Sequence, residues 1–334
     1  MKKLLALLVA ALLIVCASLA LAEPVAIKAL ILPKFESGEM AGDFPGEAQY
    51  YYEVYCEGGE SYDIVGCPNP LYVKDGVALC VTGMGKVNSA MTLQAILMDD
   101  RFDFSNAYII STGCAGSAVE YGVMGDVFVI TATVDFDLGH HADARDLTTD
   151  LATTWFHDES YDDASAKLLN QELCEKVFNL VKDVQIETTE KTRAFMAATF
   201  DNADWAIRDP KVLRGTTVTA DNYWKGMHDH ANALLMTETY GCPDPYALTE
   251  MEDHAMSVVL DRLGMLDRYI IIRDSVNTDV FMNGASPESL WDPNFVDSLA
   301  SESSVESADI FATAMKNNFA VGHVVIDAIL NGEL

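Results

Sequence analysis

The sequence predicts an α/β protein, a single domain with a central mixed, mostly parallel sheet flanked by helices. Apolar, β-branched runs alternate with helical patterns, which is the order that produces parallel strands covered on both faces. The composition suits one large folded domain, because 50% of the 334 residues are hydrophobic and 22% are charged. Polar or glycine-rich clusters follow several of the apolar runs. Open α/β sheets place their ligand groups at such strand ends.

The first 22 residues are expected to be a secretory signal peptide, so that the α/β domain covers residues 23–334. Two lysines precede an apolar run over residues 4–15 that is too short to span a membrane, and Ala20-Leu21-Ala22 supplies a small-x-small cleavage site. Cys16 is a candidate for lipid attachment, but the residue before a lipidated cysteine is usually small, and here it is Val15. We therefore favour cleavage after Ala22 over a lipid anchor. We therefore expect an exported protein, periplasmic or extracellular.

Six apolar runs of the domain are predicted strands, and four amphipathic patterns are predicted helices. The strands are expected at residues 25–32, 77–82, 107–112, 127–134, 215–219 and 269–272. The helices are expected at residues 86–97, 164–181, 251–263 and 307–330. The polar stretch 142–165 is the most loop-like part of the chain, and we interpret it as an elaboration on the same domain.

The net charge of −30 argues against several kinds of partner. Such an acidic surface repels nucleic acid and anionic membranes, so we expect neither to bind. Beyond the leader, no apolar run reaches the roughly 18 residues that a membrane-spanning helix needs, so the mature chain is not expected to be a pore. An anionic substrate would need a local cluster of cations.

Seven cysteines are present, and all but Cys16 lie in the expected mature chain, where export would expose them to an oxidising environment. Cys56 and Cys67 are the best disulfide candidates, because they lie in a segment that contains glycine and proline. Cys80 and Cys114 lie in or beside predicted strands and are expected to be buried thiols. The sequence leaves the pairing open.

The predicted strand 77–82 ends in a glycine-rich turn, Thr82-Gly83-Met84-Gly85-Lys86, at which a helix begins. Such a turn exposes backbone N–H groups that suit an anion or a sugar oxygen, so Thr82, Gly83 and Lys86 are candidate binding residues. The alternative is a turn needed only for packing. A dinucleotide site is disfavoured, because the first strand ends without the glycine fingerprint of such sites.

Two further strand ends carry candidate residues. The strand at 107–112 runs into small residues, Thr112 and Gly113 among them, that would let a ligand approach closely. A nucleophilic Cys114 would need a nearby base, and no motif identifies one, so a structural thiol is favoured. After the strand at 215–219, Tyr223 and Trp224 either stack on a flat base or simply pack.

The run Glu250-Met251-Glu252 opens the predicted helix 251–263 with an acid–Met–acid step. Carboxylates accept the two hydroxyls of a sugar diol, and a methionine can lie against the apolar face of the ring. The strand at 269–272 ends in a polar cluster that extends from Arg273 through Asn277 to Asp279. Together these runs predict a pocket for a ribose that carries a base.

These strand-end runs, in this order, resemble the purine nucleoside permease family (NUP), which is similar to nucleoside phosphorylases and nucleosidases. The most specific segments are residues 111–116 with 125–126, 220–224, 249–252 and 273–277. The resemblance covers nearly all of the mature chain. It implies a nucleoside-phosphorylase-like domain that binds a purine nucleoside without a cofactor, with phosphate as a candidate co-substrate.

The resemblance also implies roles for single residues. Met251 and Glu252 would hold the ribose, with Glu252 accepting its diol hydroxyls, and Tyr223 would stack on or beside the base. Asn277 would bond the purine near its departing ring nitrogen, where phosphorolytic relatives have Asn and nucleosidase relatives have an Asp that donates a proton. Glu36, or its neighbour Glu39, would position water or contact the ribose.

Three functions stay open. The first is cleavage of an N-glycosidic bond, by water or by phosphate, although the strand-end motifs offer phosphate only Lys34 and Lys86. The second is a non-catalytic binding component of uptake that works with a separate membrane transporter. The third is metal binding by His140-His141 or by His228 and His230, which is disfavoured because neither group has a recognised zinc spacing. Relatives of this fold assemble, so a homo-oligomer is also expected.

Overall fold

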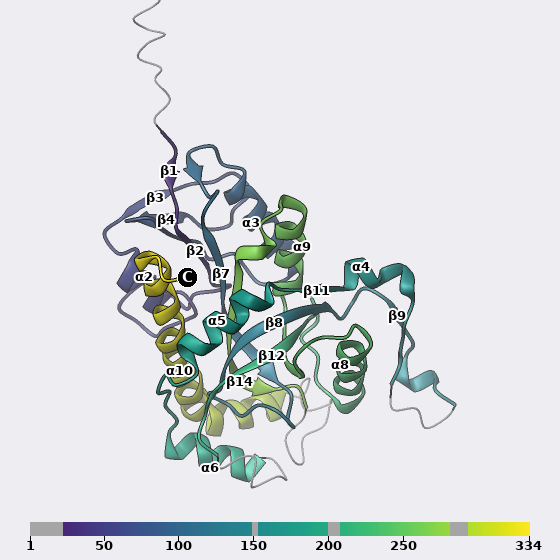
Figure 1. Ribbon diagram of the computed structural model, residues 1–334. Helices are drawn as coiled ribbons and strands as arrows, with labels where there is room; N and C mark the ends of the chain where they lie inside the picture. Colours follow the sequence, from purple (N-terminus) through teal and green to yellow (C-terminus); the bar gives the residue numbers. More distant parts are fainter. Residues whose placement is uncertain (1–22, 149–152, 200–207, 281–292) are drawn as a thin grey trace, which may run out of the picture.

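The computed structural model describes residues 23–148, 153–199, 208–280 and 293–334, and the expected signal peptide lies outside these ranges. A large mixed sheet runs through the centre, with helices packed on both of its faces (Figure 1). The predicted α/β fold class is confirmed. Among the described residues, no helix combines the length and the apolar character needed to cross a membrane.

The large sheet has the strand order β11-β8-β12-β13-β7-β2-β5-β4-β3, and β14 pairs with both β7 and β8. Its strands are β2 (Ala29–Leu32), β3 (Glu60–Tyr62), β4 (Leu71–Lys74), β5 (Val77–Leu79), β7 (Tyr108–Ser117), β8 (Val127–Asp135), β11 (Ala166–Leu168), β12 (Val212–Thr219), β13 (Tyr246–Glu250) and β14 (Tyr269–Thr278). Two short pairs lie apart from it, β1 (Val25–Ala26) with β6 (Phe102–Asp103) and β9 (His140–His141) with β10 (Trp155–Phe156).

Five of these strands close into a ring, because β14 hydrogen-bonds to β7 on one side and to β8 on the other. From β8 the ring continues through β12 and β13 and returns to β7. Parallel pairings join β2 to β5 and β7, β7 to β14, and β12 to β8 and β13, whereas antiparallel pairings close the ring and form the edges. The ends of β7, β13 and β14 therefore meet at one place.

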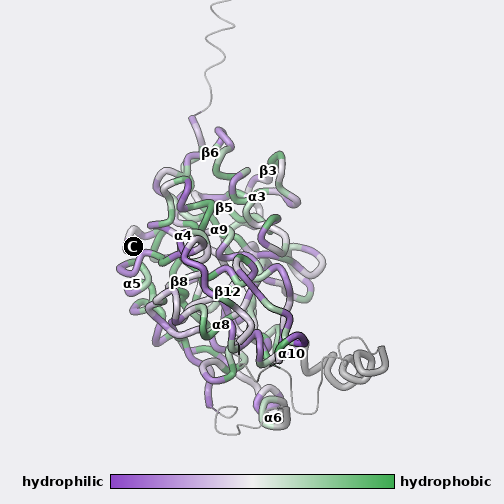
Figure 2. Tube along the Cα trace, turned by 90° about the vertical axis from the view of Figure 1, so that its right-hand side faces the viewer, coloured by the Kyte–Doolittle hydropathy of each residue, from purple (hydrophilic) through white to green (hydrophobic). Residues whose placement is uncertain are grey.

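Helices cover both faces of the sheet. They are α2 (Gln49–Tyr55), α3 (Lys86–Leu97), α4 (Asp162–Ser165), α5 (Gln171–Val181), α6 (Glu190–Thr199), α8 (Met227–Thr239), α9 (Asp253–Leu263) and α10 (Pro293–Asn331). The apolar side chains of α3 and α9 pack in one cluster, and those of α2, α5 and α10 pack in another. Every residue of β8 is buried, which is why its sequence is almost continuously apolar or β-branched instead of alternating. Apolar segments accordingly run through the interior in Figure 2.

Element boundaries differ from the predictions where tertiary pairing decides them. The helix at 86–97 is found as predicted. The helix predicted at 164–181 begins only at residue 171, because residues 166–168 form a strand that pairs with β8. The helix predicted at 251–263 begins at residue 253, because residues 246–250 form β13. The last helix is longer than predicted and begins at residue 293.

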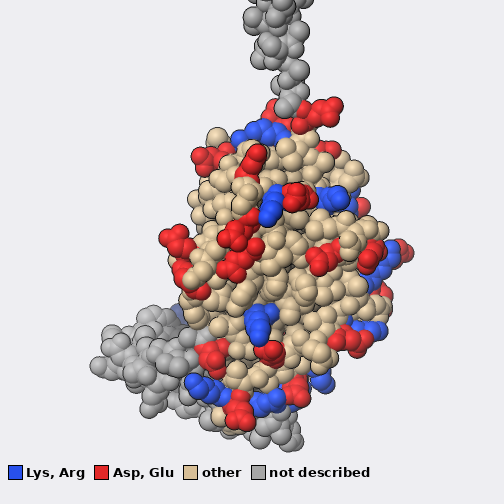
Figure 3. Space-filling model, turned by 90° about the vertical axis from the view of Figure 1, so that its left-hand side faces the viewer, with Lys and Arg blue, Asp and Glu red and all other residues tan. Residues whose placement is uncertain are grey.

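The six cysteines of the described residues are free thiols, so the suspected Cys56–Cys67 disulfide is not formed. Cys56 belongs to the cluster on the α2 and α10 side of the sheet, whereas Cys67 packs against the cluster on the α3 and α9 side. The sheet separates the two side chains. Acidic side chains spread over much of the face shown in Figure 3, in keeping with the net charge of −30.

Candidate functional site

A cavity of about 200 Å³ lies where the ends of β7, β13 and β14 meet. We call it the strand-end cavity. It is lined by Lys34, Phe35, Glu47, Met84, Cys114, Ala115, Gly116, Tyr223, Thr249, Glu250, Met251, Glu252, Arg273, Val276 and Asn277. The acid–Met–acid run, the small residues after Gly113 and Asn277, which was expected to contact the base, thus line one cavity. A smaller hollow beside Trp224 and Thr278 shares part of this lining.

Two glycines of β7 make room for side chains of the cavity wall. A Cβ atom on Gly113, whose φ is +142°, would lie 2.5 Å from the carboxylate of Glu47. A Cβ atom on Gly116 would lie 2.6 Å from Oδ1 of Asn277. Any larger residue at either position would push a carboxylate or an amide out of place, which explains why this strand end consists of small residues.

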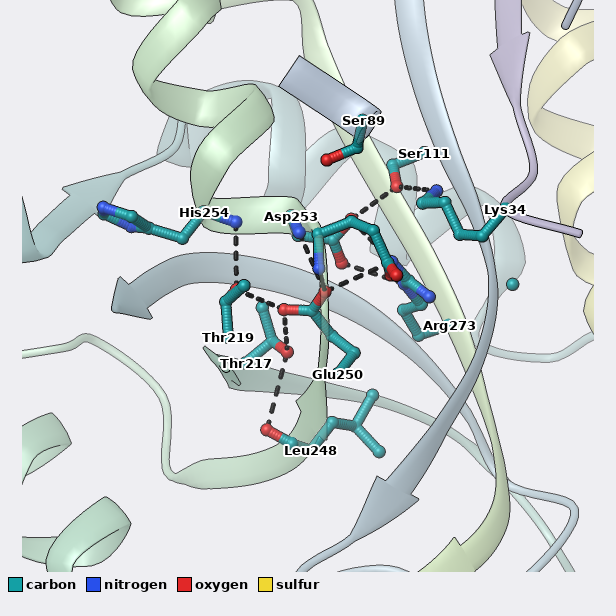
Figure 4. A network of polar contacts seen from close by, with 12 residues as sticks. Lys34, Ser89, Ser111, Thr217, Thr219, Leu248, Glu250, Asp253, His254 and Arg273 are labelled. Carbon is teal, nitrogen blue, oxygen red and sulfur yellow. Dashed lines mark hydrogen bonds and ion pairs between the residues drawn. The ribbon is translucent and has the colours of Figure 1, made fainter. Parts of the chain in front are cut away.

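Arg273 is the central cation of the wall, and it is only 1% exposed. Its guanidinium donates to Asp253 Oδ2 at 2.9 Å and lies 3.3 Å from Glu250 Oε2 (Figure 4). It also donates to Glu252 Oε2 at 3.0 Å. Burial lowers the pKa of Arg273, but the three carboxylates outweigh burial and hold it well above its usual value. One buried charge therefore fixes three acidic side chains at the start of α9.

Glu250, the last residue of β13, orients the residues that follow it. Its Oε2 accepts hydrogen bonds from the backbone N–H groups of Glu252, at 2.6 Å, and Asp253, at 2.8 Å. Its Oε1 accepts from the hydroxyls of Thr217 and Thr219 (Figure 4). Burial raises the pKa of Glu250 to about 7, although all of these partners donate and so favour the carboxylate.

Glu252 is 3% exposed, and both of its oxygens have partners. Oε2 faces Arg273, and Oε1 accepts the backbone N–H of Gly85 at 2.9 Å. Gly85 has a φ of +91°, which favours glycine. The predicted glycine-rich turn therefore meets the acid–Met–acid run through Gly85, while Met84 of the same turn lines the cavity.

Glu47 is a cavity residue that the sequence analysis missed. It is 5% exposed, and it accepts hydrogen bonds from the backbone N–H groups of Lys34, at 2.6 Å, and Cys114, at 2.8 Å. Burial raises the pKa of its carboxyl group, with Arg273 and Lys34 opposing the change. The only sequence signal is an acid just before the helix that follows the first strand, which is too common a pattern to single it out.

Glu36 lies elsewhere, although it was expected to position water. It is not among the residues that line the cavity, and its Oε2 accepts hydrogen bonds from the backbone N–H groups of Ala48, at 2.9 Å, and Gln49, at 2.7 Å. These bonds fold the loop back so that Glu47, the neighbour of Ala48, reaches the cavity. The place expected for Glu36 therefore belongs to Glu47.

Lys86 and Thr82 also lie outside the lining of the strand-end cavity. Lys86 Nζ lies 2.9 Å from Asp135 and 2.7 Å from Asp137. Burial lowers the pKa of Lys86, but the hydrogen bonds with the two carboxylates outweigh burial and raise it. Thr82 is buried, and its hydroxyl donates to the carbonyl oxygen of Gly83 at 3.0 Å. The predicted anion site at this turn is thus filled by the protein's own acids.

Thr112 and Asp279 are also buried, and both bond to other buried groups of the protein. The hydroxyl of Thr112 donates to Oδ1 of Asn318 in α10. Asp279 is buried, and it contacts His230 Nδ1 at 2.7 Å and the hydroxyl of Tyr246 at 2.8 Å. Neither residue lines the strand-end cavity.

Tyr223 lies at the mouth of the cavity, with 62% of its surface exposed. Asn277 Nδ2 donates a hydrogen bond to the Tyr223 hydroxyl at 3.0 Å, so that the two expected base-side residues form one unit. Trp224 instead stacks on Phe136, with ring centroids 5.1 Å apart and planes 20° from parallel. Of the two predicted aromatics, only Tyr223 faces the strand-end cavity.

The histidines considered as metal ligands have other partners. His230 is held by Asp279, and His140 Nε2 lies 3.2 Å from Asp158. Within the described ranges, no group of three or more His, Cys, Asp and Glu side chains is placed to hold a metal ion. The metal-binding alternative gains no support from these contacts.

The family model described as purine nucleoside permease (NUP) matches residues 26–333. A probable purine nucleoside permease of Schizosaccharomyces pombe is 27% identical over 224 residues, which cover 59% of this chain and 63% of that protein. A purine nucleoside permease of Candida albicans is 24% identical over 212 residues, 58% of this chain and 52% of that protein. The chain thus spans between half and two thirds of the length of these relatives.

Solved structures resemble the whole fold. A 5′-methylthioadenosine/S-adenosylhomocysteine nucleosidase of Neisseria meningitidis matches with a TM-score of 0.54 and 16% identity over 90% of this chain and 99% of that chain. The enzyme of the same name from Helicobacter pylori matches with a TM-score of 0.53 and 15% identity, also over 90% and 99%. This likeness confirms the expected nucleoside-phosphorylase-like fold, and at such low identity it extends to the fold alone.

Proposed function

The chain belongs to the purine nucleoside permease family, and we propose that it binds a purine nucleoside in the strand-end cavity and cleaves its N-glycosidic bond with water. One observation carries the proposal. Two buried carboxylates, Glu47 and Glu252, line the same cavity as Asn277. A nucleoside offers matching groups, since its diol needs acceptors, its anomeric carbon needs activated water and its base needs hydrogen-bonding partners.

Glu252 would hold the ribose. Its carboxylate oxygens keep lone pairs beyond the bonds to Gly85 and Arg273, and these can accept the two hydroxyls of a diol. Met251 supplies an apolar surface for the sugar ring. Because Arg273 and Gly85 fix the carboxylate before ligand binds, little ordering is needed when the ribose arrives.

Glu47 would act as the general base. As the glycosidic bond breaks, its electron pair leaves with the purine and positive charge develops on the sugar. Glu47 takes a proton from water while the water oxygen adds to the anomeric carbon. Burial raises the pKa of Glu47, which makes its carboxylate a stronger base for taking a proton from water.

Asn277 and Tyr223 would bind the departing base. An amide has no acidic proton, so Asn277 stabilises the purine through hydrogen bonds, and the base takes its proton from solvent at the exposed mouth. The same feature favours a second function, the capture of nucleosides for uptake without cleavage. In that function the protein would hand its ligand to a separate membrane transporter.

The charge of the wall favours water over phosphate. Lys34 Nζ donates to Ser111 Oγ at 2.8 Å and to the carbonyl oxygens of Leu32 and Thr112. Its three N–H groups therefore already have hydrogen-bond acceptors within the protein. Arg273 is surrounded by carboxylates. A phosphate dianion would meet the carboxylates of Glu47 and Glu252 without a cation of its own, and like charges at such close range repel strongly.

The test is to incubate the protein lacking residues 1–22 with inosine, adenosine and guanosine, with and without phosphate, and to measure free base. We expect release that does not depend on phosphate. Release only with phosphate would overturn the choice of water, and tight binding without any release would favour nucleoside capture. The leader's role is tested separately, by asking whether the full chain is processed after residue 22 and found outside the cytoplasm.

A further inference from the structure

Two cysteines that do not line the strand-end cavity, Cys67 and Cys80, are neighbours. Cys67 belongs to the loop before β4, Cys80 directly follows β5, and each thiol is close enough to shift the pKa of the other. Cys67 Sγ also lies 3.7 Å from the carbonyl oxygen of Thr92. Asn69 holds the two segments together, because its Nδ2 donates to the carbonyl oxygen of Val81 at 2.8 Å and its own carbonyl oxygen lies 3.5 Å from Cys80 Sγ. Both cysteines pack in the cluster on the α3 and α9 side of the sheet.

The other described cysteines, Cys242 beside Thr216 among them, have neighbours that are not thiols. Cys56 Sγ lies 3.8 Å from the carbonyl oxygen of Tyr72, and Cys174 Sγ lies 3.5 Å from that of Ile130. Cys114 lies beside the Glu47 carboxylate. Among the described residues, the contact between Cys67 and Cys80 is thus the place where two thiols are positioned to react with each other.

We propose that Cys67 and Cys80 form a disulfide when the protein meets a small disulfide such as oxidised glutathione, or the disulfide of a thiol oxidoreductase. The Cys67 thiolate attacks one sulfur of the oxidant, so that a mixed disulfide forms and one thiolate leaves. Cys80 then loses its proton and attacks Cys67 Sγ, which releases the second thiolate. Two protein thiols become one disulfide, and the oxidant gains two electrons and two protons.

The environments of the two thiols decide this order of attack. Cys67 is partly exposed, and the neighbouring Cys80 thiol lowers the pKa of the Cys67 thiol, with burial opposing the change. Cys80 is fully buried, and its pKa is raised, first by the Cys67 thiol and then by burial. An oxidant in solution can therefore reach Cys67, which is also the better thiolate, whereas Cys80 can react only with Cys67.

The bond would brace one wall of the strand-end cavity. Cys80 is followed by Val81 and Thr82 and then by the turn that contains Met84 and Gly85. Met84 lines the cavity, and Gly85 donates its N–H to Glu252. A disulfide at Cys80 ties the strand that leads into this turn to the loop before β4, and closing a loop of this length would raise the melting temperature by about 5 °C.

The test treats the mature protein with oxidised glutathione, blocks remaining thiols under denaturing conditions and maps the peptides by mass spectrometry. We expect a mass loss of two hydrogen atoms, a linked pair of peptides that contain Cys67 and Cys80, and a higher melting temperature that a reducing agent reverses. Cys67→Ser should abolish the link, and the matched control Cys56→Ser should retain it. The proposal would be overturned if the blocking reagent still modified both Cys67 and Cys80 after oxidation, because both thiols would then be free. A lasting glutathione adduct on Cys67, or a link from Cys67 to Cys56, would overturn it as well.

Discussion

The guanidinium of Arg273 donates to Glu252 at 3.0 Å, and this contact joins strand β14 to the start of helix α9. Both side chains are almost completely buried. The pair belongs to a cluster in which Glu250 and Asp253 also face the same cation. Their negative charges are tolerated in the interior because Arg273 is there, and the candidate ribose site depends on that balance.

Replacing Arg273 with Met should therefore destabilise the fold strongly. Glu250, Glu252 and Asp253 would be left buried without their counter-charge, which costs about 3–5 kcal/mol. Urea unfolding followed by circular dichroism measures the loss. Arg101→Met is the matched control, because it removes an exposed pair with Asp99 and should leave the urea midpoint almost unchanged. Equal effects of the two substitutions would show that the cluster is not a structural centre.

Glu252→Ala should weaken nucleoside binding without unfolding the protein. Loss of the two hydrogen bonds that the diol donates to the carboxylate corresponds to a rise in Kd of about 10- to 100-fold. Isothermal titration calorimetry with inosine gives the value. Asp261→Asn provides the control, because it removes an acid from the exposed face of the same helix and should leave Kd unchanged. An unaltered Kd in Glu252→Ala would place the ribose elsewhere.

Activity should fall on the alkaline side of about pH 8. Burial, with help from Arg273, lowers the pKa of Lys34 to about 8, so that its ammonium group is charged below that pH and neutral above it. Loss of this charge makes the wall around Glu47 and Glu252 more negative. On the acid side, activity should fall as Glu47, whose pKa is raised by burial, becomes protonated and can no longer accept a proton.

The measurement is kcat/KM for base release between about pH 4 and pH 11, a range that includes the ordinary pKa values of both kinds of group. Lys34→Met should abolish the alkaline decline while the acid decline persists. A wild-type profile that stays flat through pH 9 would separate Lys34 from the reaction.

Gly113→Ala should abolish cleavage at a moderate cost in stability. The added Cβ would lie 2.5 Å from the Glu47 carboxylate, so that Glu47 must move out of the cavity wall. Gly241→Ala is the control, because Gly241 also has a positive φ, +64°, but open space around its Cβ position. It should cost only about 1–2 kcal/mol of backbone strain and leave cleavage intact. Full activity of Gly113→Ala would mean that the position of Glu47 is unimportant.

The parts of the site that the sequence revealed are those with a local pattern. Met251 and Glu252 open the predicted helix 251–263, and Asn277 follows a predicted apolar strand, so period and polarity identify all three. Glu47 has no such pattern, because it reaches the cavity only when Glu36 folds the intervening loop back. That contact depends on three-dimensional packing.

Two errors have the same physical origin. Lys86 looked like an anion-binding residue, but its partners Asp135 and Asp137 come from the end of another strand. Strand β13 was missed because its five residues owe their conformation to pairing with β12 and β7, which are distant in sequence. Short strands and ion pairs of this kind depend on tertiary contacts that a window along the chain does not contain.

The most direct test of the account is base release from inosine by the wild-type protein and by Glu47→Gln. The amide keeps the shape of the side chain and can still accept one of the two backbone N–H groups that bind Glu47, but it cannot take a proton from water. We expect unchanged inosine affinity and a loss of kcat of about 100-fold or more. Undiminished release by Glu47→Gln would contradict the proposal that Glu47 activates the attacking water.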